Sequence, residues 1–404
     1  MPGTITSRNP SPVGAAEPPA PDRRWPTAER LCYPFSHAMR QRYQNWMHNW
    51  ETRLTTRDTN RVVRPFDWGV EWTRDWPGLN GAGPDHSALE YFFHQLNRHI
   101  VAHSDQFFSY RTPTDFRIEK HPVKLHASGG NNGNDKDEER GTGDFLRFTS
   151  AVETPYAENN TANARWFPAR GRRAVIVLPQ WNADALSHNA LCRMMNFCGI
   201  AGLRLSMPYH DVRRPAELER ADYAVSANIG RTIAAARQAI LDVRCCLDWL
   251  ESQGYREFGI LGTSLGSCYA FIASAHDPRL RVNAFNHAST YFAGVVWTGQ
   301  STRHVRAGVE REITLESLRD CWRAISPMSY FDQFSRFPKK SLVVYATYDL
   351  TFLPEFSRQI VAEFRRRRLD HRIAVLPCGH YTTGETPYKF LDAWHLVRFI
   401  NGAL

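Results

Sequence analysis

The chain has 404 residues, of which 42% are hydrophobic and 23% are charged, and its formal net charge is +9. This length suits one large α/β domain with appended segments. No stretch approaches the run of about 18 uncharged apolar residues that a transmembrane helix needs. The eight cysteines form no C-x-x-C pair, and residues 1–30 lack the apolar core of a secretory signal. These features predict a cytoplasmic protein with reduced thiols, and no nucleic-acid motif accompanies the positive charge.

The first part of the chain divides into two kinds of sequence. Residues 1–30 are rich in Pro and small polar residues and are predicted to be disordered, because they have little to bury. Residues 31–115 are predicted to form a helical extension, since aromatic and apolar residues recur at helical spacing in 27–58 and 86–109. That stripe indicates packing on a main domain of residues 116–404, and a lid over an active site is the alternative.

The main domain begins with strand-like segments at 116–125, 145–153 and 164–167, which are expected to be antiparallel at a sheet edge. From Ala174 onward, apolar strands alternate with helices, a pattern typical of a parallel sheet covered by helices on both faces. Residues 291–337 interrupt this alternation and are predicted to form a cap-like insertion. The strands of the alternating part are expected at 174–178, 203–207, 258–261, 282–285, 342–346 and 373–376.

One strand, within residues 256–276, enters a helix through the turn Gly262–Gly266, which reads G-T-S-L-G. This is G-x-S-x-G in a strand–turn–helix context, an arrangement that exposes the serine hydroxyl above the sheet. Side chains in place of the two glycines would collide with the adjacent strand and helix. Ser264 is therefore predicted to be a nucleophile. The backbone N–H of Leu265, at the helix start, is predicted to face a developing oxyanion. A chance five-residue match is the alternative.

Two later strand ends offer the partners that a nucleophilic serine needs. Asp349 follows the strand at 342–346 and His380 follows the strand at 373–376, so the order along the chain is Ser, Asp, His. His380 is predicted to be the base that takes the serine proton, and Asp349 the acid that orients it. Less favourably placed candidates are Asp332 and Glu355 for the acid, and His287, His371 and His395 for the base.

The second oxyanion donor is expected in the loop after the strand at 174–178, where Trp181 is the candidate and Gln180 the alternative. The Trp181 ring is expected either to wall the pocket or to pack. Polar residues that follow the strand at 203–207 are expected to brace a loop, with substrate binding as the alternative; they are His210, Asp211, Arg213 and Arg214. No metal-binding spacing and no G-x-G-x-x-G fingerprint occurs, so neither a metal nor a nicotinamide cofactor is expected.

Residues from about 140 to 404 resemble the α/β-hydrolase superfamily. The resemblance is carried by the Gly262–Gly266 turn, by Asp349 followed by Pro354, and by the pair Gly379-His380. It implies an α/β-hydrolase fold with a mostly parallel central sheet and helices on both faces. It also implies attack on acyl carbonyls through an acyl-serine intermediate without a cofactor. The His-Gly motif usual at the second oxyanion donor is absent, and residues 1–115 lie outside the resemblance.

A finer resemblance rests on Leu178–Trp181 and Pro208–His210, which are similar to the branch called α/β-hydrolase domain-containing protein eighteen. The sequence as a whole predicts a serine hydrolase that cleaves carboxylic esters of a small-molecule or lipid-like substrate. The same triad suits a peptidase, a thioesterase or an acyltransferase. The sequence also leaves open a non-catalytic binding protein on a hydrolase scaffold, and a lipid hydrolase in peripheral contact with a membrane, favoured by the +9 charge and the aromatic N-terminal helices.

Overall fold

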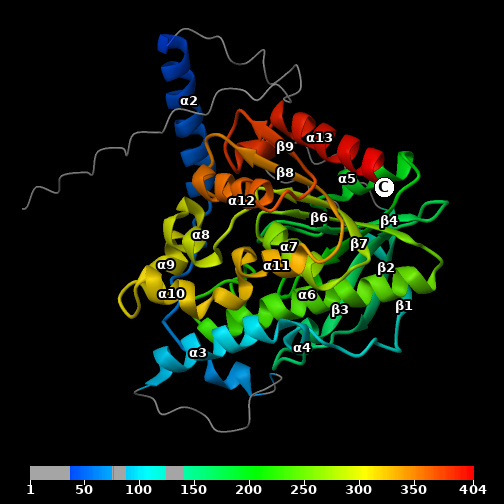
Figure 1. Cartoon of the computed structure of the whole chain (residues 1–404), viewed down its shortest axis with the longest axis horizontal. Coiled ribbons are helices and arrows are strands. Elements are labelled where there is room, and N and C mark those ends of the chain that lie inside the picture. Colours follow the sequence, from blue (N-terminus) through cyan, green and yellow to red (C-terminus); the bar gives the residue numbers. More distant parts are fainter. Residues whose placement is uncertain (1–36, 75, 77–87, 124–140) are drawn as a thin grey trace, which may run out of the picture.

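The computed structural model describes residues 37–74, 76, 88–123 and 141–404 (Figure 1). The segment 1–30, for which disorder is predicted, lies outside these described residues. Within them, the predicted alternation of strands and helices from Ala174 onward is confirmed.

A nine-stranded mixed sheet runs through the molecule in the order β1-β2-β3-β5-β4-β6-β7-β8-β9 (Figure 1). The pairings of β1 with β2, β2 with β3 and β3 with β5 are antiparallel, as expected for this edge. The pairings from β5 to β9 are parallel. The strands are β1 (Arg117–Val123), β2 (Gly141–Thr149), β3 (Thr161–Phe167), β4 (Arg173–Leu178), β5 (Ala201–Ser206), β6 (Glu257–Thr263), β7 (Leu280–Asn286), β8 (Lys340–Ala346) and β9 (His371–Leu376).

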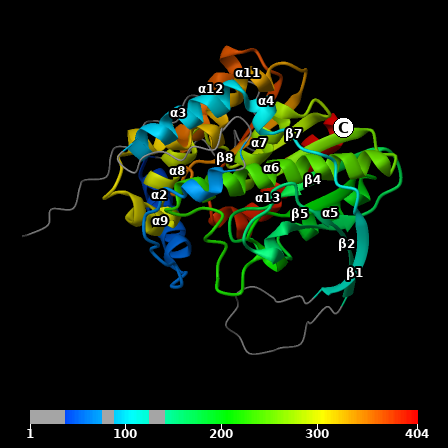
Figure 2. The ribbon, with the colours of Figure 1, turned by 90° about the horizontal axis from the view of Figure 1, so that it is seen from below.

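Helices cover both faces of this sheet (Figure 2). The α-helices are α2 (His37–Thr56), α3 (Leu89–Ala102), α4 (Ser104–Phe107), α5 (Asn189–Phe197), α6 (Ile229–Ser252), α7 (Leu265–His276), α8 (Phe292–Thr298), α9 (Arg303–Val309), α10 (Leu315–Cys321), α11 (Phe331–Phe334), α12 (Pro354–Arg366) and α13 (Tyr388–Ala403). The 3-10 helices that matter for the site are η3 (Ala157–Asn160), η4 (Asp211–Arg213) and η8 (Thr382–Gly384).

The strand β4 shows why both faces are covered. Ile176 and Leu178 belong to the core that α6, α7 and α12 cover, whereas Val175 and Val177 belong to the core beneath α5 and α13. Successive side chains of a strand point to opposite faces, so a strand in which nearly every residue is apolar needs a helical layer on each side. The continuous apolar runs in the sequence therefore predict the parallel part of the sheet correctly.

The N-terminal helices pack on this sheet domain in two ways. Phe93 and Ile100 of α3 are buried in the larger core, as the helical spacing predicts. In α2, Met47 is buried and Tyr43 and Trp50 pack against the smaller core, whereas Trp46 is 49% exposed, so this aromatic stripe packs on the domain only in part. The reason is that α2 contacts the rest of the molecule along a narrow face and leaves most of its surface to solvent. Among the described residues, no helix combines the length and apolarity that crossing a bilayer requires.

Candidate active site

The turn between β6 and α7 places Ser264 in a strained backbone conformation, with φ 57° and ψ −119°. Close backbone contacts explain why the positions two before and two after Ser264 are glycine. A Cβ at Gly262 would lie 2.2 Å from the carbonyl oxygen of Gly266, and a Cβ at Gly266 would lie 2.4 Å from that of Leu178. The strand, the helix and the end of β4 therefore meet so tightly that only glycine fits. A non-glycine residue held at positive φ by its surroundings is typical of a functional site.

The structure brings Ser264, His380 and Asp349 together in one hydrogen-bond chain. The Oγ of Ser264 lies 2.9 Å from Nε2 of His380, and Nδ1 of His380 lies 2.8 Å from Oδ2 of Asp349. Because the carboxylate only accepts, Nδ1 of His380 carries the proton. Nε2 is then free to accept the serine proton, which is the arrangement that general-base activation of a serine requires.

Asp349 accepts four hydrogen bonds. Its Oδ1 accepts from the backbone N–H groups of Thr351 and Phe352 at 2.8 and 2.7 Å, while its Oδ2 accepts from His380 and from Nδ1 of His287 at 3.0 Å. Burial alone would raise the pKa of Asp349, but the two histidines outweigh it and hold the pKa well below its ordinary value. The acid therefore stays ionised beside the histidine that it orients.

His287 also belongs to this cluster, and its place is next to the acid rather than the serine. Burial and the nearby His380 lower the pKa of His287, so the ring is neutral and donates through Nδ1. Asp332 pairs instead with Arg367 at the surface, and His371 bonds the carbonyl of Leu369, so neither residue takes part in the chain at Ser264. His287 directly follows β7, a strand-end position of the kind that identified Asp349 and His380 in the sequence.

A second residue that sequence reasoning missed is Glu51 of α2, which is fully buried. Its carboxylate accepts hydrogen bonds from the backbone N–H groups of Tyr381 and Thr382, each at 2.9 Å, and so holds the loop that carries His380. A Cβ at Gly379 would lie 2.4 Å from Oε2 of Glu51, which gives a physical reason for the Gly379-His380 pair. The contact joins residues 330 positions apart, and no local sequence pattern signals it.

The charge of Glu51 also acts on the histidine. Burial would lower the pKa of His380, but the charge and hydrogen bond of Asp349, together with the charge of Glu51, raise it above its ordinary value. Burial raises the pKa of Glu51 itself, against the two backbone hydrogen bonds that favour its ionised form. Two carboxyl groups therefore act on His380: Asp349 is hydrogen-bonded to its ring, and Glu51 is hydrogen-bonded to the backbone of the residues that follow it.

Leu265 and Trp181, the two residues predicted to supply an oxyanion hole, both line the cavity above Ser264. Leu265 is the first residue of α7, where the backbone N–H has no carbonyl acceptor within the helix. The ring of Trp181 lines the cavity, stacks on His304 with ring centroids 5.6 Å apart, and donates its indole N–H to the carbonyl of Ala221 at 2.9 Å. The Trp181 ring therefore both walls the cavity and packs.

The loop that carries Trp181 is held in place by His210. The backbone N–H of Asn182 donates to Nε2 of His210 at 3.0 Å, and the side-chain oxygen of Asn182 accepts from the N–H of Ala221 at 2.7 Å. His210 donates through Nδ1 to the carbonyl of Pro208 at 2.8 Å, and burial lowers its pKa to about 4. A neutral ring with this tautomer is the one that accepts from Asn182, so the expected bracing role is what the geometry shows for His210.

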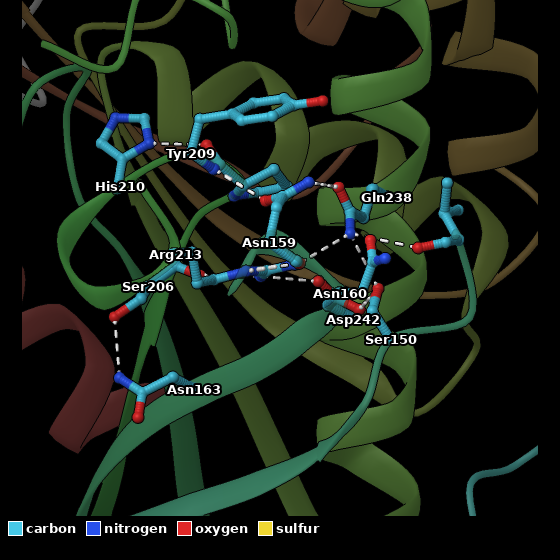
Figure 3. Close-up of polar contacts among 12 residues, drawn as sticks. Ser150, Asn159, Asn160, Asn163, Ser206, Tyr209, His210, Arg213, Gln238 and Asp242 are labelled. Atoms are coloured by element: carbon cyan, nitrogen blue, oxygen red, sulfur yellow. Dashed lines mark hydrogen bonds and ion pairs between the residues drawn. The ribbon is translucent and has the colours of Figure 1, made fainter. Parts of the chain in front are cut away.

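A buried polar network supports His210 from below (Figure 3). Arg213 and Asp242 form an ion pair at 2.8 Å with both side chains fully buried, and Arg213 also donates to the carbonyl of Asn159. The side chain of Asn159 bonds Gln238 of α6 at 2.8 Å and accepts from the N–H of Tyr209 at 2.9 Å. Strand β5, η3 and α6 are thereby locked around the turn that presents His210.

The neighbours of His210 differ in what they do. Asp211 forms an ion pair with Arg204 in which both side chains are buried, so it braces the same turn. Arg214 lines the cavity. Bracing is therefore shared by three of the four polar residues predicted at this strand end, and Arg214 is the exception.

The cavity that opens above Ser264 has a volume of about 650 Å³ and two kinds of lining. An apolar part comes from α7 and α8 and consists of Leu265, Cys268, Phe292, Val295 and Val296. A polar part includes His188, Thr263, Asn286 and Asp392, which come from the loop before α5, the ends of β6 and β7, and α13. Burial raises the pKa of Asp392 to about 7. The serine thus stands where an apolar and a polar group of one small molecule would meet.

Among the described residues, the side chains grouped closely enough to hold a metal ion are His287, Asp349 and His380, whose ligand atoms lie within 4.8 Å of one another. Both imidazole Nδ1 atoms already donate to Oδ2 of Asp349. These hydrogen bonds account for the proximity of the three groups, and a metal would have to displace the protons that orient His380.

Comparison with known proteins relates the chain to others through its fold. No protein-family model and no curated protein sequence matches the chain. Among solved structures, acetyl xylan esterase 1 from a Thermoanaerobacterium species is 15% identical over 84% of this chain and 99% of its own, with a TM-score of 0.50. The acetyl xylan esterase from a Paenibacillus species is 13% identical over 83% and 99%, also at 0.50.

An acylaminoacyl peptidase from Pyrococcus horikoshii has the same TM-score of 0.50 and 10% identity over 66% of this chain. The chain covers 46% of that peptidase, less than half of its length. Likenesses at this level of identity bear on the fold alone. The strand order, the helices on both faces and these three likenesses together show that the chain has the α/β-hydrolase fold.

Proposed function

We propose that this protein is a serine hydrolase that cleaves carboxylic esters through an acyl-serine intermediate. The observation that carries the proposal is the continuous hydrogen-bond chain from the Oγ of Ser264 through His380 to Asp349, at 2.9 and 2.8 Å, open to the cavity at its serine end. A base in contact with the serine and an ionised acid in contact with the base are the two conditions for activating a hydroxyl as a nucleophile.

The reaction would proceed in two halves. As Oγ of Ser264 attacks the carbonyl carbon of the ester, Nε2 of His380 takes the hydroxyl proton and then donates it to the departing alkoxide, which leaves as an alcohol. A water molecule then loses a proton to His380 and attacks the acyl-serine carbonyl. The acid product departs when the proton returns to Oγ of Ser264. Asp349 remains ionised throughout and stabilises the positive charge that His380 carries between the two transfers.

The oxyanion that forms twice in this cycle would accept hydrogen bonds from the backbone N–H groups of Leu265 and Trp181. Support comes from the helix start at Leu265 and from the fixed loop at Trp181, which His210 and Asn182 hold through the contacts described above. Preorganised donors of this kind contribute most when they need no rearrangement as charge develops.

The preference for a small ester rests on the cavity. A volume of about 650 Å³ suits a small molecule, and the lining offers apolar contacts for an acyl chain and polar contacts for an oxygen-bearing alcohol. Peptidases, thioesterases and acyltransferases use the same triad. Comparing the turnover of an ester, a thioester and an amide that share one acyl group would identify the reaction type. The resemblance to the domain-containing protein eighteen branch stays a prediction.

Labelling with a fluorophosphonate, which reacts with activated serines, tests the proposal. We expect the wild-type chain to be labelled, Ser264→Ala and His380→Ala to lose labelling, and Ser252→Ala, at the exposed end of α6, to behave like the wild type. Ester turnover should fall in the first two variants by about four to six orders of magnitude.

Two outcomes would contradict the proposal. Labelling that persists in folded Ser264→Ala would place the reactive serine elsewhere. A folded wild-type chain that is not labelled and turns over neither ester, thioester nor amide would favour a binding protein on a hydrolase scaffold.

A further inference from the structure

Three helices present large apolar side chains to solvent. They are α2, α13 and α5, and the side chains are Met39 and Trp46, Phe390 and Trp394, and Met194 and Phe197. Phe197 is 92% exposed and Phe390 is 65% exposed. Single exposed apolar residues are ordinary on a protein surface, whereas several on adjoining helices mark an interaction site.

The three helices form one continuous surface. The Tyr43 hydroxyl of α2 lies 2.7 Å from that of Tyr388 at the start of α13, and the ring of Trp50 bridges Tyr388 at 6.2 Å and Trp46 at 5.0 Å between centroids. Helix α13 in turn packs against α5. Figures 1 and 2 both place α13 between α2 and α5. We call this the α2–α13–α5 surface.

The charged residues on the solvent-facing sides of these three helices are basic. The basic residues are Arg40, Arg42 and Arg53 of α2, Arg193 of α5, and Lys389 and Arg398 of α13. The two acidic residues of the same helices are turned to the interior: Glu51 holds the His380 loop, and Asp392 lines the cavity and accepts from Asn286 at 2.9 Å. Glu385, in the turn before α13, adds an exposed carboxylate. The outer face is therefore basic and aromatic together.

Cations and aromatic rings are interleaved on α13. The ammonium of Lys389 lies 5.4 Å from the ring centroid of Phe390, and the guanidinium of Arg398 lies 4.9 Å from that of Trp394. Phe390 and Trp394 are one helical turn apart and so share a face. Aromatic rings beside basic side chains suit the headgroup region of a bilayer, where the ring enters the boundary and the cation meets lipid anions.

The cavity borders this surface. Its lining includes Lys389 in the first turn of α13, Gly384 in the preceding 3-10 helix, and Arg57 directly after α2. Lys389 therefore belongs both to the surface and to the lining of the cavity that contains Ser264.

We propose that the α2–α13–α5 surface docks on an anionic lipid bilayer, with its aromatic side chains at headgroup depth and its basic side chains on lipid anions. Charge complementarity decides between this occupant and a second copy of the chain, because two copies of one basic face would repel each other. The docking is independent of the chemistry at Ser264. Its consequence, that lipid esters of the bilayer are the substrates, rests on the proposed hydrolase function.

Flotation of the full-length chain with vesicles tests the docking. We expect binding to vesicles of phosphatidylcholine with phosphatidylserine, weak binding to phosphatidylcholine alone, and a loss of binding at high salt. Removing one cation from each helix in R42Q/R193Q/K389Q should weaken binding about a hundred-fold, at about five-fold per basic residue. W46S/F390S/W394S, which keeps every cation, should also weaken binding at low salt, because the aromatic side chains no longer enter the headgroup region.

The matched control is Y91S/R98Q, which removes an exposed aromatic and an exposed cation from α3, a helix that Figure 1 places away from the surface. It should bind like the wild type. Equal weakening in this control, or undiminished binding of the triple charge variant, would overturn the proposal. A third result would also overturn it: the wild type sediments as a dimer, W46S/F390S/W394S sediments as a monomer, and neither protein binds vesicles.

Performing flotation with Ser264→Ala separates the two proposals. Unchanged vesicle binding with lost turnover supports both. Should Ser264→Ala keep full turnover, the hydrolase proposal fails while the flotation result still decides the docking. The substrate consequence is then tested by comparing turnover of one long-chain ester presented in anionic vesicles and as free monomer, with faster turnover in vesicles expected only for chains that keep the surface.

Discussion

At the scale of single residues, the candidate site depends on how many groups hold each member of the chain from Ser264 through His380 to Asp349. Asp349 is fixed by two backbone and two imidazole donors, and His380 is fixed by Asp349 on one side and by a loop that Glu51 holds on the other. Each of these acceptors is buried, so each orients its partner without competition from water. Glu51 thereby links the N-terminal helix to the base.

Replacing Glu51 by glutamine should therefore change the pH dependence of ester turnover. The base must be neutral to act, so kcat/KM rises with pH through the pKa of His380. The charge of Glu51 raises that pKa, and Glu51→Gln should move the rising limb to lower pH. The amide group also meets backbone donors that need an acceptor, so kcat/KM on the plateau should fall about ten- to a hundred-fold.

The measurement is a pH–rate profile of kcat/KM, with Glu90→Gln on the exposed face of α3 as control. If Glu51 had a merely structural role, Glu51→Gln would reduce the yield of folded protein. The rise of kcat/KM with pH, measured on the protein that does fold, would then stay at its wild-type pH.

At the scale of secondary-structure elements, the candidate site is built from loops at the carboxyl ends of the strands, and contacts with α6 hold one of these loops in place. The turn after β5 presents His210 to the loop after β4, and its support is the buried pair of Arg213 and Asp242, which ties the turn to α6. Breaking a buried ion pair leaves an uncompensated charge in a low-dielectric interior, which costs more than the pair contributes while intact.

Arg213→Met should therefore lower the free energy of unfolding by about 3–5 kcal/mol, because Asp242 is left buried without its cation. Arg214→Met, one residue away and lining the cavity, should leave that free energy within about 0.5 kcal/mol of the wild-type value. Urea unfolding of both variants checks this. Similar losses in the two variants would show that the turn, rather than the buried pair, determines the stability.

At the scale of the whole molecule, the two N-terminal helices do different work. Helix α3 adds Phe93 to the larger core, on the face of the sheet that α6 and α7 cover. Helix α2 adds Met47 to the smaller core and reaches the His380 loop, where the hydroxyl of Thr382 contacts the Met47 sulfur at 3.4 Å. Helix α3 therefore contributes to the core alone, whereas α2 also holds the loop that carries His380.

Two cavity-forming variants separate these contributions. Phe93→Ala should cost about 3–5 kcal/mol of stability and leave the rate of fluorophosphonate labelling per folded molecule unchanged. Met47→Ala should cost about 2–5 kcal/mol and slow labelling as well, because the loop beneath His380 loses its packing. Labelling rates that are equal in the two variants would contradict an active-site role for α2.

The parallel sheet, the antiparallel edge and the turn at Ser264 could all be predicted from the sequence. Those features rest on local signals: continuous apolar runs, their alternation with helical spacing, and glycines where backbones meet. The sequence also predicted that Asp349 and His380 would approach the serine, because parallel strands end at one edge of the sheet and residues directly after them share that edge.

Contacts between residues far apart in the sequence could not be predicted and became visible in the folded structure. Glu51 meets Tyr381 across 330 positions, and nothing in the local pattern of α2 distinguishes this carboxylate from one on a solvated face. The exposure of Trp46 was likewise undetermined, because helical spacing states which residues share a face but not whether another element covers it. Periodicity is a property of one segment, whereas burial and charge pairing are properties of how segments meet.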